Sequence, residues 1–154
     1  MKTTRIFSAS RSQRGVYAIE FAMVFMIFFS ILYAIVCYGM LFAFRLGLQN
    51  AAEDGARAAL QYQIQIPDRK DRAKAVAIVQ SSWMPQVQPP IVQICRVEGI
   101  NQCDPITCGP TWSQRCQVEV LIQVNNLESL LPPMPGFAVP TQIAGSASML
   151  LDVR

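Results

Sequence analysis

The longest hydrophobic feature of the chain is an uncharged run from Phe21 to Phe44, in which Ser30 is the one clearly polar side chain. At ~1.5 Å rise per residue, a helix over this run exceeds the ~30 Å hydrocarbon core of a bilayer. A buried core helix is the alternative, but a chain of 154 residues has little bulk to surround a helix that is apolar on every face. The pattern therefore predicts a membrane-spanning helix, with its transmembrane part at about 21–44.

Helical spacing continues beyond the run, because Arg45 to Gln65 lacks proline and is rich in Ala, Leu and Gln. One long helix is expected over 16–66, beginning near Val16, reaching about Gln65 and ending at Pro67. Small residues recur on one stripe of its outer part, which can either pack against another helix or cover the chain's own domain. Both interpretations stay open for these candidate packing residues: Ala51, Ala52, Gly55 and Ala58.

The C-terminal part changes to a pattern with period two. Valine and isoleucine alternate with polar residues from Cys116 to Asn125, which predicts a half-buried strand. Ile91 to Glu98 and Ile143 to Val153 are predicted as two further strands. The four prolines between Leu127 and Pro140 predict a loop, with apolar anchors such as Leu130, Leu131 and Phe137. With a short helix from Asp68, this gives an α+β domain over 67–154 whose antiparallel sheet of three or so strands is covered by the long helix.

Charge divides the chain at Gly15. Four basic residues and no acidic one precede it, so the net charge of +3 comes from a basic leader at 1–15, and no basic surface for nucleic acid remains. Positive flanks stay cytoplasmic, which places the chain after Arg45 outside. The run is too long for a cleaved secretory signal. The bulky Val36 before Cys37 argues against a lipoprotein site.

Five cysteines and no histidine set the candidate chemistry. Without histidine, or a nucleophile beside a base, no catalytic set, cofactor or enzyme activity is expected. The cysteines outside the run lie eight, five and eight positions apart, and four cysteines allow three disulfide pairings. Nested pairing, Cys95 with Cys116 and Cys103 with Cys108, suits a hairpin. A zinc site is the alternative, but C-x-x-C is absent and the predicted side is oxidising, so no metal is expected.

Two segments resemble a known family. A basic residue, Gly15, four mostly apolar residues from Val16, then Glu20 and Phe21 before a long apolar helix resemble the type IV prepilin processing site. The segment R-L-G-L-Q-N-A-A-E-D-G-A-R-A-A, from Arg45 to Ala59, resembles the juxtamembrane signature of TadE/TadF-like pseudopilins of the tight-adherence (Flp) pilus system. The C-terminal G-S-A-S-M-L-L-D-V-R is similar to the closing strand of those proteins.

The resemblance implies a minor pilin or pseudopilin that assembles or primes a pilus. A prepilin peptidase would cut between Gly15 and Val16, and Glu20 would neutralise the new N-terminal amine of an adjacent subunit. The implied partners are the membrane, this peptidase, other pilins or pseudopilins and the inner-membrane assembly platform. The chain would cross the bacterial inner membrane once, with a periplasmic domain, and could enter the pilus. The alternative is an uncleaved single-pass anchor that presents a disulfide-stabilised binding domain.

Overall fold

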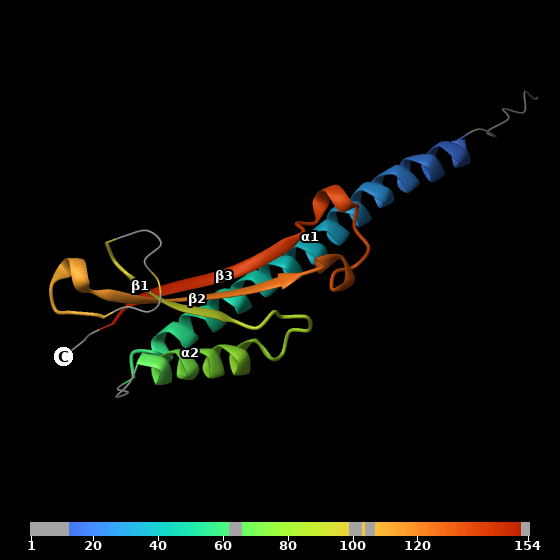
Figure 1. The fold of residues 1–154 in the computed structure, drawn as a ribbon. Helices are drawn as coiled ribbons and strands as arrows, with labels where there is room; N and C mark the ends of the chain where they lie inside the picture. The colour runs from blue at the N-terminus through green and yellow to red at the C-terminus, as the bar shows by residue number, and fades with distance from the viewer. Residues whose placement is uncertain (1–12, 62–65, 99–102, 104–106, 152–154) are drawn as a thin grey trace, which may run out of the picture. The chain divides into compact units, whose positions relative to one another are not determined.

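The computed structural model describes residues 13–61, 66–98, 103 and 107–151, apart from the side chains of residues 13, 14, 66 and 137. These residues form, in chain order, α1 (Gln13–Ala58), α2 (Ile66–Ser81), β1 (Ile91–Arg96), β2 (Cys116–Asn125) and β3 (Gln142–Leu150) (Figure 1). The described residues up to Tyr38 and those from Gly39 onward form two separate units, and α1 contributes to both. A long apolar helix, a second helix and a three-stranded antiparallel sheet confirm the predicted α+β class.

Helix α1 ends earlier than the sequence predicts, at Ala58 and not near Gln65. The backbone N–H of Leu60 donates to the carbonyl of Arg57, and that of Gln61 donates to the carbonyl of Ala58. These two bonds span three residues instead of four, so they tighten the backbone at the C-terminus of α1. Pro67 does not end α1. It lies in the first turn of α2. Backbone N–H groups there have no acceptor within the helix, so proline costs the helix no hydrogen bond.

The sheet has the order β1-β2-β3, and β2 occupies the residues predicted for it. Its even-numbered valines and isoleucine, between Val118 and Val124, are fully buried. Across the sheet they lie opposite Val92 and Ile94 of β1 and opposite alternate residues of β3 from Ile143 to Met149. Side chains of paired residues share a face, so one face of the sheet forms the core.

The outer half of α1 packs on this core face at very short range. A methyl group added at Gly145 of β3 would overlap the backbone of Leu48 and Gln49. A methyl group at Gly55 would lie 3.0 Å from the Cβ of Ala77 in α2 and 3.5 Å from Val120 Cγ1 in β2. Glycine at these two positions therefore lets the helix backbone approach both the sheet and α2.

The proline-rich loop between β2 and β3 contains the 3₁₀ turns η2 (Leu127–Ser129) and η3 (Gly136–Ala138). Leu131, one of the expected apolar anchors, is buried, and Leu130 is half-buried. Leu127 and Val139 are further buried anchors. The third expected anchor, Phe137, has its side chain outside the described residues.

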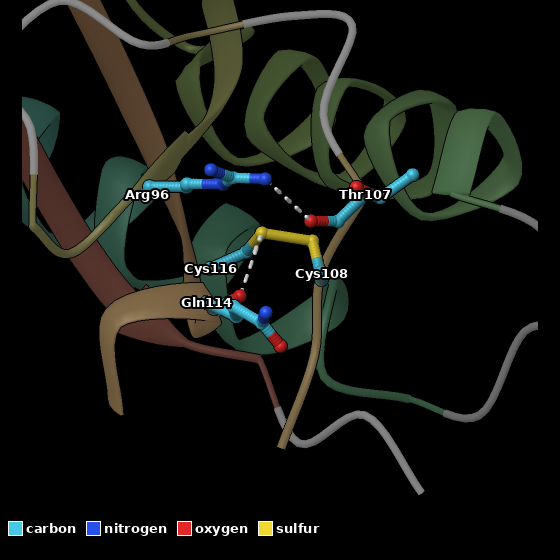
Figure 2. The surroundings of a disulfide bond; sticks show 5 residues. All are labelled: Arg96, Thr107, Cys108, Gln114 and Cys116. Carbon is cyan, nitrogen blue, oxygen red and sulfur yellow. Dashed lines mark hydrogen bonds between the residues drawn. A yellow bond between two sulfur atoms is a disulfide. The ribbon is translucent and has the colours of Figure 1, made fainter. Parts of the chain in front are cut away.

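All four cysteines outside α1 form disulfides, as predicted, but the nested pairing is wrong. The bonds join Cys95 to Cys103 and Cys108 to Cys116. Figure 2 shows the second of these bonds. The register of the sheet explains this, because Cys95 lies opposite Gln117 and Arg96 lies opposite Cys116. Adjacent residues of a strand point to opposite faces, so the side chains of Cys95 and Cys116 are on different faces and cannot meet.

Candidate processing and assembly site

The predicted processing residues lie in the first turns of α1. Gly15 and Val16 are both helical, and 63% of the Val16 surface is exposed. A methyl group added at Gly15 would meet no atom within 4 Å, in contrast to Gly55. Glycine inside a helix costs about 1 kcal/mol relative to alanine. No contact among the described residues requires glycine at position 15, which leaves its small size available to a partner outside the chain.

Glu20 lies one helical turn after Val16 and therefore on the same side of α1. Its side chain is exposed and forms no ion pair or hydrogen bond with any residue that the structure describes. Phe21 begins a line of aromatic rings at helical spacing, with centroids 5.8 Å apart for Phe21 and Phe25 and 4.7 Å apart for Phe25 and Phe29. The carboxylate thus lies at the start of an exposed aromatic stripe, without a partner among the described side chains.

The apolar part of α1 is exposed rather than buried, so it is not the core helix of a soluble domain. Within the described residues, Gly15–Ala58 is the helix long and apolar enough to cross a membrane. Typical side chains along it, such as Ile19, Phe28 and Ile35, keep 59–67% of their surface exposed. The hydroxyl of Ser30 donates to the Met26 carbonyl at 2.8 Å, so the polar group of the run is satisfied within its own helix.

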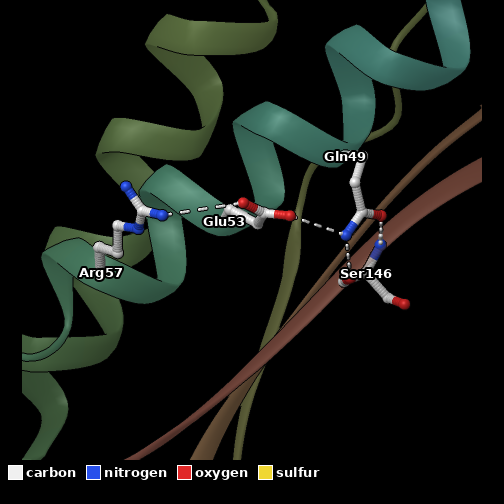
Figure 3. A network of polar contacts seen from close by, with 4 residues as sticks. All are labelled: Gln49, Glu53, Arg57 and Ser146. Carbon is white, nitrogen blue, oxygen red and sulfur yellow. Dashed lines mark hydrogen bonds and ion pairs between the residues drawn. The ribbon is translucent and has the colours of Figure 1, made fainter.

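Beyond the run, Gln49 connects α1 to the outer edge of β3. Its side-chain amide donates to the Ser146 carbonyl at 3.0 Å and accepts from the Ser146 N–H at 3.3 Å (Figure 3). The same Nε2 donates to Glu53 Oε1 at 3.3 Å, and Glu53 is 3.9 Å from Arg57 Nη2. Gln49 therefore makes the two hydrogen bonds that a neighbouring strand would make with Ser146.

The predicted packing residues of this segment are buried in the domain to which the outer half of α1 belongs. Ala51, Ala52 and Ala58 keep at most 6% of their surface, and Gly55 contacts α2 and β2. Their small size lets α1, α2 and the sheet of this chain approach one another.

Residues 15–57 match the family model of TadE-like proteins. This segment is TadE-like. The match supports a protein associated with the tight-adherence pilus system, as the sequence resemblance implies. The comparisons found no similar curated protein and no similar solved structure.

The TadE-like segment holds the candidate processing residues, the apolar run and the polar series from Gln49 to Arg57. Sequence reasoning missed the contact of Gln49 with Ser146, which joins residues 97 positions apart. The spacing of Gln49, Glu53 and Arg57 at four-residue intervals does indicate a polar row on one helix face. It cannot indicate that a strand edge lies beside that row.

Proposed function

We propose that this chain is a membrane-anchored minor pilin or pseudopilin of a tight-adherence pilus, used in assembling or priming the fibre. The TadE-like match supports the pilus system. The observation that carries the finer role is the arrangement at the start of α1. There an unpacked Gly15, an exposed Val16 and a Glu20 with no partner in the described part of the chain lie on one helix. This role requires binding and positioning, and no catalysis by the chain itself.

In this proposal a prepilin peptidase cuts after Gly15, and the new amine of Val16 becomes positively charged. An unpaired carboxylate at the edge of a membrane helix is unfavourable, and a paired one is tolerated. Glu20 then pairs with the Val16 amine of a neighbouring subunit and sets the axial stagger between the two helices. The leader would lie in the cytoplasm and the domain in the periplasm, with the anchor in the inner membrane.

The decisive experiment is the intact mass and N-terminal sequence of the protein from its native membrane. A chain beginning at Val16 supports the proposal. Gly15→Leu is expected to block the cut, because a peptidase pocket that fits glycine excludes a branched side chain, while Gly39→Leu serves as a matched control. Gly39 also lies on α1 with no neighbouring atom within 4 Å of an added methyl group.

A wild-type chain that still begins at Met1, with the peptidase present, contradicts the proposal. It would favour instead an uncleaved single-pass anchor that presents its disulfide-bonded domain to a ligand or surface.

A further inference from the structure

The folded domain begins inside the uncharged run. Leu41 and Phe44, in the last turn of that run, are partly buried and pack against the hydrophobic core of the domain. The uncharged run before them, 21–40, would be about 30 Å long as a helix, which is the thickness of a bilayer's hydrocarbon core. No linker therefore separates the residues that would leave the membrane from the folded domain.

The contacts of α1 within the domain show which end of the sheet lies nearest Leu41 and Phe44. Gly145 packs on Leu48, while Val120, which pairs with Ala147, lies beside Gly55. Strand β3 therefore leads away from Leu41 and Phe44, and β2 leads toward them. Two loops meet at the near end, 82–90 and 126–141, here called the base. The hydroxyl of Ser129 donates to Gln86 Oε1 at 3.2 Å and joins them.

Trp83 lies at this base. Its indole ring covers Gly47, where an added methyl group would overlap it, and its centroid is 6.0 Å from that of Phe44. Nevertheless, 55% of its surface is exposed. Tryptophan, with an apolar ring and a polar N–H, is enriched where membrane helices pass from hydrocarbon into headgroups.

The charged residues of α2 are concentrated at the end of the helix that lies away from Trp83. Helix α2 lies antiparallel to α1, since Ala73 and Ala77 lie near Gly55 and Trp83 lies over Gly47. Its six charged residues all lie between Asp68 and Lys74, and none follows until Arg96. Glu128 is the single charged residue in the base, whose other polar groups are neutral amides and hydroxyls. Neutral polar groups and exposed tryptophan suit a lipid headgroup layer, whereas the charged far end suits water.

We propose that the base rests on the headgroup layer of the membrane in which α1 is anchored, with Trp83 at the boundary between headgroups and hydrocarbon. The partner is the lipid surface itself. The base contains no lysine or arginine, so the contact is not expected to depend on anionic lipid. This inference relies on the proposed function only for the membrane anchor, and needs neither cleavage nor pilus assembly.

The chain carries its own control for a test. Trp112 is also 55% exposed, but it lies just before Cys116 at the opposite end of β2. From the rise of α1 between Gly47 and Gly55 and of β2 between Val120 and Cys116, the Cys116 end of β2 lies about 25 Å along the domain from Gly47, the residue that Trp83 covers. The full chain would be reconstituted in phosphatidylcholine vesicles containing a headgroup-labelled nitroxide lipid. Trp112→Phe leaves Trp83 as reporter, and Trp83→Phe leaves Trp112.

We expect the protein to float with the vesicles and the fluorescence of Trp83 to be quenched at least about threefold more than that of Trp112. Equal quenching in protein that floats would overturn the inference and leave the anchor intact. Protein that does not float would overturn the inference and the membrane anchor together. Retention of the leader in native membranes would overturn the proposed processing alone, so the two failures are distinguishable.

Discussion

The side chain of Gln49 occupies both backbone hydrogen-bonding groups of Ser146, at 3.0 Å and 3.3 Å. A residue of the TadE-like helix thereby takes the place of a further strand at the exposed edge of β3. Open strand edges are templates for unwanted pairing with other chains. The polar part of the juxtamembrane segment thus protects the sheet at this position, while its small residues provide the close packing.

Gln49→Ala should lower the free energy of unfolding by about 1 kcal/mol, because two hydrogen bonds at a partly exposed site are lost. Gln49→Glu should be no better, since a carboxylate cannot donate to the Ser146 carbonyl and would face Glu53. Urea unfolding of the full chain in detergent micelles, followed by tryptophan fluorescence, measures both. Asn50→Ala is the matched control at an exposed neighbour. An identical unfolding midpoint for Gln49→Ala and Asn50→Ala would contradict the edge role.

Gly55→Ala should destabilise the domain and Gly39→Ala should not, although both residues lie on α1. A methyl group at Gly55 would be 3.0 Å from Ala77 Cβ and 3.1 Å from the Ala73 carbonyl oxygen, so overpacking should destabilise the domain by about 1–3 kcal/mol. Gly39 has open space, and alanine there should leave stability unchanged or raise it by up to about 1 kcal/mol. Thermal unfolding in micelles compares them, and equal shifts would argue against the tight contact of α1 with α2.

The disulfide pairing can be tested by one chemical cut. Asp104–Pro105 is the single Asp–Pro bond of the chain and lies between Cys103 and Cys108. Mild acid cleaves such bonds. With Cys95 joined to Cys103 and Cys108 joined to Cys116, the two halves should separate on a non-reducing gel. Halves that stay joined until reduction would show the nested or the crossed pairing instead.

Glu20→Ala should insert and be processed normally, because it removes a charge from the edge of an apolar helix, yet pilus output should fall by at least about tenfold. That loss corresponds to roughly 1.4 kcal/mol or more of missing pairing energy, a lower bound that lies below the ~3–5 kcal/mol for breaking a fully buried ion pair. Ser30→Ala is the control within the same helix, where the hydroxyl already bonds to Met26. Sheared pili measured by immunoblot give the readout, and normal output from Glu20→Ala would count against the pairing role.

Local sequence patterns predict an element correctly where each of its faces has the same environment along its whole length. The alternation from Cys116 to Asn125 predicts β2 to the residue, because each side of the strand has a constant environment. The end of α1 was harder to predict, since Leu60 and Gln61 are good helix formers. There the packing of α2 against Gly55 requires the chain to reverse before Pro67. Tertiary contact overrode helix propensity at that point.

The contacts that position the candidate site depend on partners far away in sequence. The sequence around Gly145 does not indicate that Leu48 packs on it, and the sequence around Trp83 does not indicate that its ring covers Gly47. The disulfide pairing also required the register, which moved Cys95 and Cys116 to opposite faces. The Gly15-to-Phe21 motif could be recognised without any fold because its spacing is local.

The two disulfides each close a ring between cysteines eight positions apart, and neither joins one strand to another. If the domain is pulled between α1 and its C-terminus, the three strands have only hydrogen bonds and side-chain packing to resist separation. Each disulfide instead excludes the residues of its ring from the length to which the chain can extend. At ~3.4 Å per extended residue, the two rings together reduce this length by about 50 Å. The cysteines therefore limit how far the domain can extend under force, and leave the force at which it opens to the sheet.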